Sequence, residues 1–404
     1  MDGYTDCAFR QIVKEIFDKY GEKDNYELYL WTEFMNADGY IINPVGVMKH
    51  LMMTKEQAPV IAQIFGGNED MLIKCFKDIQ EKYFLKGVQS KKRYINPKPG
   101  TINSELPGGV AVQEKQANTG FPGFAGLELN IGCPARNVMS TGGGSALLKN
   151  KTECLRIIKN IREGLRIPFS IKTRTGLNDD DKKEQMEFLI KASKYVDMIT
   201  IHGRTVKQVY AGLTDWDFIY HLKESVSQQE QCAYNEIKNG ELRIENGKKN
   251  HTSCKILGNG GISSYQEIET IKGNLDGVLI GQAAIGNPRI FTPHIPDKKE
   301  IKETILKHLD YMIATEIYFQ GGKMERWKNG KILIMPTKEN LDEIILHLPQ
   351  LKSNVQGLSS IVVAFRKHLF QYIKGIPGSK ELKVRLSQIK EYEPLVKEIQ
   401  NFFG

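Results

Sequence analysis

The stretch Gly126–Pro134 reads Gly-Leu-Glu-Leu-Asn-Ile-Gly-Cys-Pro, a short apolar strand pattern that ends in a polar turn. Similar runs recur through the first three quarters of the chain, and helical patterns lie between them. The predicted strands are Glu27–Phe34, Pro59–Phe65, Gly126–Ile131, Pro168–Arg174, Val196–Ile201, Cys254–Gly258 and Asp276–Ile280. The predicted helices are Cys7–Lys19, Asp70–Tyr83, Lys151–Gly164, Asp181–Tyr195, Ser263–Lys272 and Gln282–Phe291. Apolar strands that alternate with helices indicate a parallel sheet covered on both faces.

Polar or glycine-rich clusters follow most of these strands. Their positions distinguish between two α/β folds, the doubly wound sheet and the barrel. A doubly wound sheet also alternates strands and helices, but functional groups at so many strand ends favour a (β/α)8 TIM-type barrel. A first strand should precede the polar loop at residues 2–6, and the pattern lacks it. We therefore expect a barrel that lacks its first strand at the N-terminus, with an opening between the first and last strands that remain.

The chain divides by pattern into two predicted domains. Residues 1–293 form the barrel, with polar insertions at about 86–124 and 226–251. Residues 294–404 form an α-helical domain, with one hairpin pattern near 324–336.

Composition excludes several classes of protein. No apolar run approaches the ~18–20 residues of a membrane helix, and the six cysteines contain no Cys-x-x-Cys pair. The cysteine spacing argues against a zinc site or a disulfide framework and suits the cytoplasm. Lys and Arg exceed Asp and Glu by 56 to 48, and from Asp297 onward by 18 to 13. A basic second domain is compatible with a polyanionic partner.

Asn130 and Cys133 carry the sharpest chemical signal. Asn130 lies near the end of the predicted strand Gly126–Ile131 and Cys133 just after it, and the glycine run 142–144 that follows allows the backbone to approach a ligand. A thiol at this place can act as a nucleophile or as a general acid. The alternative is a buried structural cysteine, the usual state of a free thiol.

In these residues the chain resembles the tRNA-dihydrouridine synthases. The matching pieces are MDGYTDCAFR, WTEF, QIFGGNED, LNIGCPARNV with GGGSALL, SIKTRTG, IHGRTVKQVYAGLTDWD, LGNGGI, VLIGQAAIGNP and AFRKHLFQYIKGIPGSKELK, in the family's order. The resemblance implies an FMN-dependent barrel, NADPH as reductant, a helical domain that binds tRNA, and a monomer. It also implies that Cys133 gives a proton to C5 of uracil while Asn130 holds the uracil edge.

The resemblance assigns the cofactor to three strand ends. Gln63 would contact the edge of the isoalloxazine ring, because an amide both donates and accepts. Lys172 would place a positive charge beside the flavin, although a strand-end lysine can also point to solvent. His202 would bind cofactor or substrate and Arg204 a phosphate; the alternative is that they pair with Asp215 or Asp217.

The FMN phosphate is expected at the last two strand ends. Asn259, Gly260 and Gly261 follow one strand, and Gly281 and Gln282 follow the next. Their backbone N–H groups and a following helix N-terminus would bind the anion, whereas the simpler reading is a pair of tight turns. The family usually has Asp at Gly261 and Arg at Gln282. Met1 would lie where the missing first strand ends and would line the flavin.

Arg366 and Lys367 mark the expected tRNA contact. They lie in a predicted helix with further basic residues after them, and the alternative is a solvated basic face. The whole pattern predicts reduction of the C5–C6 double bond of tRNA uridines. Rival predictions are an FMN barrel that acts on a small molecule, as in dihydroorotate dehydrogenases or ene-reductases, and a tRNA-binding member that has lost catalysis.

Overall fold

A computed structural model describes residues 3–83, 123–238, 253–320, 335–351 and 357–404. Met1, nearly all of the 86–124 insertion and most of the hairpin pattern near 324–336 lie outside the described residues. Within them, no helix is both long and apolar enough to cross a membrane.

The centre of the molecule is a curled sheet of parallel strands, part of a TIM-type barrel. Its order is β1-β3-β4-β5-β6-β7-β8, and β2 also pairs with β3 beyond the end of β1. Strands β3 and β4 are buried along their whole length, so helices must cover their outer face. The bounds are β1 Leu30–Trp31, β2 Met35–Asn36, β3 Val60–Phe65, β4 Gly126–Asn130, β5 Phe169–Arg174, β6 Met198–His202, β7 Lys255–Asn259 and β8 Gly277–Leu279.

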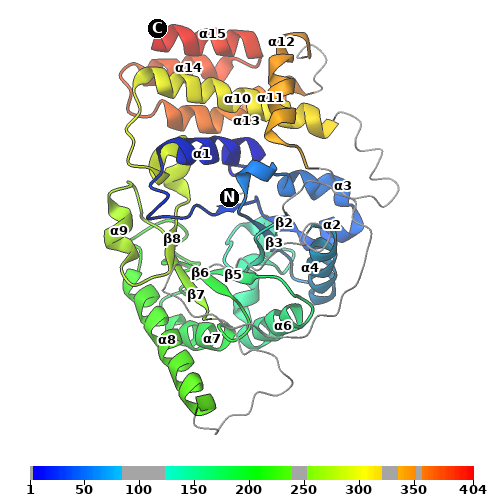
Figure 1. Ribbon diagram of the computed structural model, residues 1–404, viewed down its shortest axis with the longest axis vertical. Helices are drawn as coiled ribbons and strands as arrows, with labels where there is room; N and C mark the ends of the chain where they lie inside the picture. The colour runs from blue at the N-terminus through cyan, green and yellow to red at the C-terminus, as the bar shows by residue number, and fades with distance from the viewer. Residues whose placement is uncertain (1–2, 84–122, 239–252, 321–334, 352–356) are drawn as a thin grey trace.

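Helices surround the sheet and form a separate bundle beside it (Figure 1). The barrel helices are α1 Cys7–Tyr20, α2 Ala37–Ile42, α3 Pro44–Val47, α4 Glu69–Tyr83, α5 Arg136–Met139, α6 Lys151–Glu163, α7 Lys182–Ala192, α8 Trp216–Lys238 and α9 Glu267–Lys272. The bundle holds α10 Lys298–Gln320, α11 Lys338–Leu346, α12 Leu348–Leu351, α13 Leu358–Tyr372, α14 Ser379–Gln388 and α15 Tyr392–Phe403. Short 3-10 turns are η1 Met48–Leu51, η2 Lys55–Gln57, η3 Gly144–Lys149, η5 Gln282–Ala284 and η6 Pro288–Phe291.

Polar side chains cap the N-termini of several of these helices. The Asp6 carboxylate accepts from the backbone N–H of Phe9 at 2.8 Å at the start of α1. Asn150 does the same for α6, at 3.1 Å from the N–H of Glu153. These acceptors satisfy N–H groups that have no partner inside the helix.

The structure confirms the predicted parallel α/β architecture and corrects three local predictions. Gln282–Phe291 does not form one α-helix but two 3-10 turns, η5 and η6, because Asn287 and Pro288 interrupt the pattern. The predicted insertion at 226–251 begins as regular helix, since α8 continues through Lys238. The predicted strand Glu27–Phe34 is reduced to β1, Leu30–Trp31, and β2 begins just beyond its predicted end, at Met35.

The sheet is open between its first and last strands, as the sequence predicted. In the described residues β8 pairs with β7, and β1 pairs with β3, so that the two ends of the strand order do not meet. The segment before β1 nevertheless contacts the far side of the opening. The Tyr26 hydroxyl donates to Glu269 of α9, and the rings of Tyr26 and Tyr265 lie 6.2 Å apart, edge to face.

Helix α1 joins the barrel to the bundle. Its Ala8, Ile12 and Ile16 pack with Tyr311 and Ala314 of α10. On another side of the helix, the buried Arg10 donates to the carbonyl oxygens of Thr5 and Met52 and to Gln57. Three hydrogen bonds satisfy a charge that would otherwise be costly to bury.

Two buried histidines lie at this junction. The ring centroids of His308 and His368 are 4.6 Å apart, and His368 stacks on Phe9 of α1 at 5.3 Å. His308 contacts the Tyr372 hydroxyl at 3.1 Å, whereas both ring nitrogens of His368 have no hydrogen-bond partner among the described residues. Burial lowers the pKa of each histidine to about 3, so both stay neutral in the folded protein.

We predict that acid destabilises the protein through these histidines. An unfolded histidine binds a proton below about pH 6.5, and the folded ones do not until about pH 3. The free energy of unfolding should therefore fall as pH decreases from 6.5, by about 1.4 kcal/mol per pH unit for each histidine. His368→Phe should remove one such contribution, measured by urea unfolding between pH 7 and 4.5. His347→Phe, at an exposed position, is the control, and an equal slope in wild type and His368→Phe would contradict the prediction.

Candidate functional site

Polar side chains occupy the inner face of the sheet toward the carboxyl ends of its strands. Residues two apart on a strand share a face, so the register carries these side chains from strand to strand. The register partners are Gln63 with Glu128, Glu128 with Ser170, Asn130 with Lys172, Lys172 with Thr200, Arg174 with His202 and His202 with Asn259. The structure thus brings together most of the residues that the sequence selected from separate motifs.

A directed chain of hydrogen bonds runs from Glu128 to the turn that carries Cys133. Gln63 Nε2 donates to Glu128 Oε1 at 2.5 Å, and Asn130 Nδ2 donates to Gln63 Oε1 at 3.0 Å. Asn130 Oδ1 then accepts from the backbone N–H groups of Gly132, at 3.1 Å, and Cys133, at 3.0 Å. Both amides are therefore held at their two ends.

Cys133 is partly exposed and its backbone is held on both sides. Its carbonyl oxygen accepts from the Ser145 N–H at 3.0 Å and from the Ser145 hydroxyl at 2.9 Å. Gly144 adopts φ +56°, and a Cβ there would lie 2.7 Å from the Cys133 carbonyl oxygen. Glycine is therefore required for this close approach. The alternative of a buried structural cysteine fits Cys7, Cys75, Cys154 and Cys254, but not Cys133.

Glu128 and Lys172 place opposite charges within the sheet interior. Burial raises the pKa of the Glu128 carboxyl, and the Gln63 amide and the Lys172 ammonium oppose that rise. Burial lowers the pKa of Lys172, which Glu128 counteracts and Arg174 reinforces. Lys172 is partly buried, next to Glu128 in the cluster.

His202 and Arg204 contact each other rather than a carboxylate. Arg204 Nη1 lies 3.2 Å from His202 Nε2, and the guanidinium also donates to the Gly212 carbonyl. Burial and the charges of Lys172, Arg174 and Arg204 lower the pKa of His202 to about 2. The imidazole is neutral, and because Nε2 accepts from Arg204, its proton is on Nδ1. Asp215, one predicted alternative partner, instead binds Lys182 at 2.8 Å.

The turn after β7 is shaped by two glycines with positive φ. Gly260 has φ +117° and Gly261 has φ +77°. A Cβ on Gly260 would lie 2.8 Å from His202 Cδ2, and one on Gly261 would lie 2.9 Å from Thr214 Oγ1. Asn259 closes the strand by donating to the Leu279 carbonyl at 2.7 Å.

The expected helix N-terminus for phosphate is not formed at these strand ends. Helix α9 starts six residues after Gly261 and has Glu267 and Glu269 in its first turn. Gly281 and Gln282 lead into η5, which has three residues, and Gln282 is exposed. Any anion held here would depend on backbone N–H groups of the turns themselves.

Arg366 and Lys367 of α13 are not part of the strand-end cluster. Arg366 donates to the carbonyl oxygen of Ile389. The Lys367 ammonium lies 5.0 Å from the centre of the Tyr4 ring, in the loop that precedes α1. Each makes a contact within the fold, so neither is simply a solvated basic residue.

Sequence reasoning missed four residues of the cluster, Glu128, Ser170, Arg174 and Thr200. The Arg174 guanidinium donates to the carbonyl oxygens of Gly132 at 3.0 Å, Thr205 at 2.9 Å and Val209 at 2.8 Å. It therefore ties the turn before Cys133 to the loop after β6. Glu128 offered a signal, because it is a charged residue between the apolar residues Leu127 and Leu129. The strand pattern of Arg174 already contains other polar residues, so it did not single Arg174 out.

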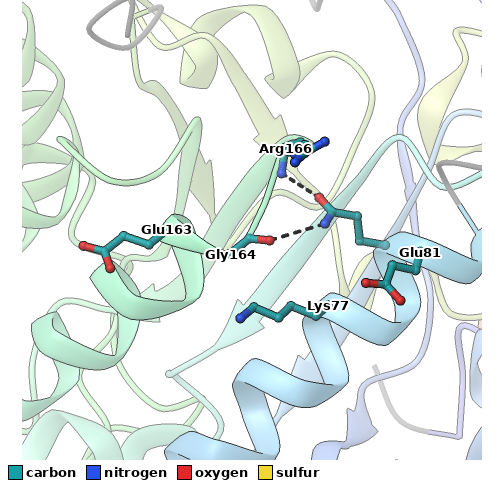
Figure 2. A pocket seen from close by; sticks show the side chains of 6 residues that line it. Lys77, Glu81, Glu163, Gly164 and Arg166 are labelled. Carbon is teal, nitrogen blue, oxygen red and sulfur yellow. Dashed lines mark hydrogen bonds between the residues drawn. The ribbon is translucent and has the colours of Figure 1, made fainter. Parts of the chain in front are cut away.

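A hollow of about 470 Å³ lies elsewhere in the barrel. Figure 2 shows it between the end of α4 and the segment that follows α6, where Lys77 lies against Gly164. Gln80 bridges the two by donating to the Gly164 carbonyl and accepting from the Arg166 N–H. These segments precede β4 and β5, so the hollow lies at the amino ends of the strands, opposite the polar cluster.

Comparisons with known proteins match this chain to one family. The model of the Dihydrouridine synthase (Dus) family matches residues 111–403. A probable tRNA-dihydrouridine synthase of Rickettsia typhi is 26% identical over 280 residues, covering 69% of this chain and 68% of the relative. A probable tRNA-dihydrouridine synthase of Aquifex aeolicus is 24% identical over 405 residues, 99% of this chain and 93% of the relative. The tRNA-dihydrouridine synthase B of Pseudomonas syringae pv. tomato is 24% identical over 281 residues, 69% and 67%.

We predict that Gly260→Ala destabilises the protein more than Gly375→Ala. Gly375 also has positive φ, at +83°, but a Cβ there would meet nothing within 4 Å. Gly375→Ala should therefore cost about 1–2 kcal/mol for backbone strain alone. Gly260→Ala should cost at least about 1 kcal/mol more, because it displaces the His202 ring. Equal urea midpoints for the two variants would contradict the prediction and show that the His202 ring moves aside at no cost.

Proposed function

The chain belongs to the dihydrouridine synthase family, and from this premise we propose that it reduces the C5–C6 double bond of uridines in tRNA, with FMN as cofactor and NADPH as reductant. The observation that carries the proposal is the position of Cys133. It is a partly exposed thiol in a turn that adjoins a row of buried polar side chains. A proton donor beside a binding surface of this kind suits addition of hydrogen across a double bond.

The chain's own residues fit FMN. The donor set contains an amide (Gln63), a cation (Lys172) and the buried hydroxyl of Thr200, which has no hydrogen-bond partner in the described part of the chain. A ring with carbonyl and imine acceptors can use each of these groups. Gly260 and Gly261 leave backbone exposed where a Cβ would collide with His202 or Thr214, which suits the close approach of a phosphate or ribityl chain.

Each residue has a separate proposed role. Bound FMN, once reduced by NADPH, would provide the hydride chemistry at C6 of the uracil. The Cys133 thiol gives its proton to C5, and the resulting thiolate regains a proton from solvent. Asn130 holds the uracil edge. The neutral His202 offers its Nδ1–H as a donor, and Arg204, which contacts His202, is placed to bind a substrate phosphate.

The cofactor phosphate is proposed to bind at the turns after β7 and β8. The phosphate would contact the backbone of Asn259, Gly260, Gly261 and Gly281 and the neutral side chain of Gln282. Lacking a formed helix N-terminus and a cationic side chain at 282, this part of the site should bind phosphate through N–H groups. Met1 stays a predicted flavin contact.

We propose that tRNA lies across the barrel mouth and the helical bundle, residues 294–404. The target base must leave its stack to reach the site. Lys374 follows α13 and Lys380 lies in α14, and both side chains are exposed. They are freer to bind phosphates than Arg366, which donates to the Ile389 carbonyl. We further propose that the enzyme acts as a monomer in the cytoplasm.

Cys133→Ala should retain FMN and tRNA binding but lose most dihydrouridine formation. A methyl group cannot give a proton to C5, and the backbone contacts of residue 133 do not involve the thiol. Single-turnover reduction of tRNA with pre-reduced flavin measures the step directly. Cys232→Ala, at an exposed cysteine on α8, is the matched control. Near-normal turnover in Cys133→Ala would reject the assigned role.

Removing two exposed lysines should weaken tRNA binding and flatten its dependence on salt. Lys374→Ala with Lys380→Ala should lower the slope of log affinity against log salt by about 1–2 units. Arg385→Ala is the control, because its guanidinium is paired with Glu398 at 2.7 Å. Oxidation of NADPH with an artificial acceptor should not change. A slope equal to that of the wild type would place tRNA elsewhere.

A further inference from the structure

We infer that Glu128 is a positioning residue, whose carboxylate sets the direction of the amide chain that ends at Cys133. This inference adds a residue role to the proposed function. Only its expected effect on the turnover of tRNA rests on that function. It starts from the fact that amides can present either end of their side chain. A carboxylate that keeps a fixed acceptor toward Gln63 removes that choice.

Both ends of the chain impose the same direction. At one end, Glu128 Oε1 accepts from Gln63 Nε2. At the other end, the backbone N–H groups of Gly132 and Cys133 can only donate, so Asn130 must turn its oxygen toward them. The Gln63–Asn130 bond at 3.0 Å then joins two amides that agree in orientation.

Glu128 matters most for Gln63. Asn130 has two N–H donors on its oxygen, whereas the side-chain nitrogen of Gln63 has Glu128 as its hydrogen-bond partner among the described residues. Without an acceptor at 128 the Gln63 amide is free to rotate, and Asn130 loses a fixed partner for its nitrogen. A less fixed Asn130 would in turn hold the backbone N–H groups of Gly132 and Cys133 less firmly.

The fixed direction also decides what the site offers a ligand. An amide has two N–H donors and two acceptor positions. Within the described structure, Gln63 uses one of each, and Asn130 uses one donor and both acceptor positions. The unused groups are one N–H on each amide and one lone pair on Gln63. The chain therefore presents mainly donors, which suits the carbonyl edges of a pyrimidine or of an isoalloxazine.

Ser170 makes a conservative variant possible. Its hydroxyl donates to Glu128 Oε2 at 3.4 Å, and a hydroxyl can also accept. In Glu128→Gln, the new carbonyl can face Gln63 and the new NH2 group can face Ser170. Glu128→Gln should thus preserve the direction of the chain, whereas Glu128→Ala should not.

Hydrogen exchange of the apoprotein tests this directly. In Glu128→Ala, the peptide that contains Gly132 and Cys133 should exchange about fivefold faster, the change expected when one neutral hydrogen bond is lost. Glu128→Gln should remain within about twofold of wild type. Leu127→Ala empties a buried position on the other face of β4, so it should raise exchange across the sheet without selecting this peptide.

A double-mutant cycle adds a second criterion. Gln63→Leu breaks the same chain at its middle, so Gln63→Leu with Glu128→Ala should exchange no faster at this peptide than either single variant. Additive effects would overturn the inference, and so would unchanged exchange in Glu128→Ala or equal damage in Glu128→Gln.

Turnover separates this inference from the proposed function. Glu128→Ala should lower kcat for tRNA, because the chain that supports the Cys133 turn is broken at its start. Glu128→Gln should restore kcat. A change in KM alone would contradict a role through Cys133. If exchange responds as expected but the wild-type enzyme reduces no uridine, the proposed function fails and the positioning role stands.

Discussion

Parallel strand register is the constraint on which the rest of the structure depends. In a parallel sheet all carboxyl ends reach the same rim, and side chains at alternate positions share a face. Asn130 is therefore placed opposite Lys172, and Arg174 opposite His202, although they come from separate motifs. A slip of one residue would move every one of these groups to the helix-covered face. The apolar positions between them, such as Leu129 and Ile171, hold that register by burial.

Placing charges inside the sheet has a cost that the local network offsets. Glu128 is buried, and its carboxylate accepts from Gln63 and Ser170 and faces the field of Lys172. Arg174 is buried as well, but it has three backbone carbonyls as partners. Such satisfied groups cost little compared with orphaned ones. The same bonds hold the Cys133 turn in place, so the stability of the site and its geometry have one cause.

The bundle supports the barrel through α1 and the loop before it. His368 stacks on Phe9, and Lys367 lies over Tyr4, so one turn of α13 contacts two points of the N-terminal segment. In Figure 1, α1 lies between the bundle and the curled sheet. Lys367, which sequence analysis assigned to tRNA, contacts the N-terminal segment, whereas Arg366 donates to Ile389 within the bundle. A basic residue can stabilise a junction without contributing to a binding surface.

The sequence by itself determined the order of strands and helices, the parallel class of the sheet and the special nature of the Cys133 turn, because apolar periodicity and turn residues are local signals. Only the tertiary structure decided which polar groups pair: Glu128 with Gln63, Arg204 with His202, and Arg366 with a backbone carbonyl. It also decided that residues 282–291 form turns instead of a helix. The physical reason is that hydrogen-bond partners and burial depend on segments distant in the chain, which no local pattern records.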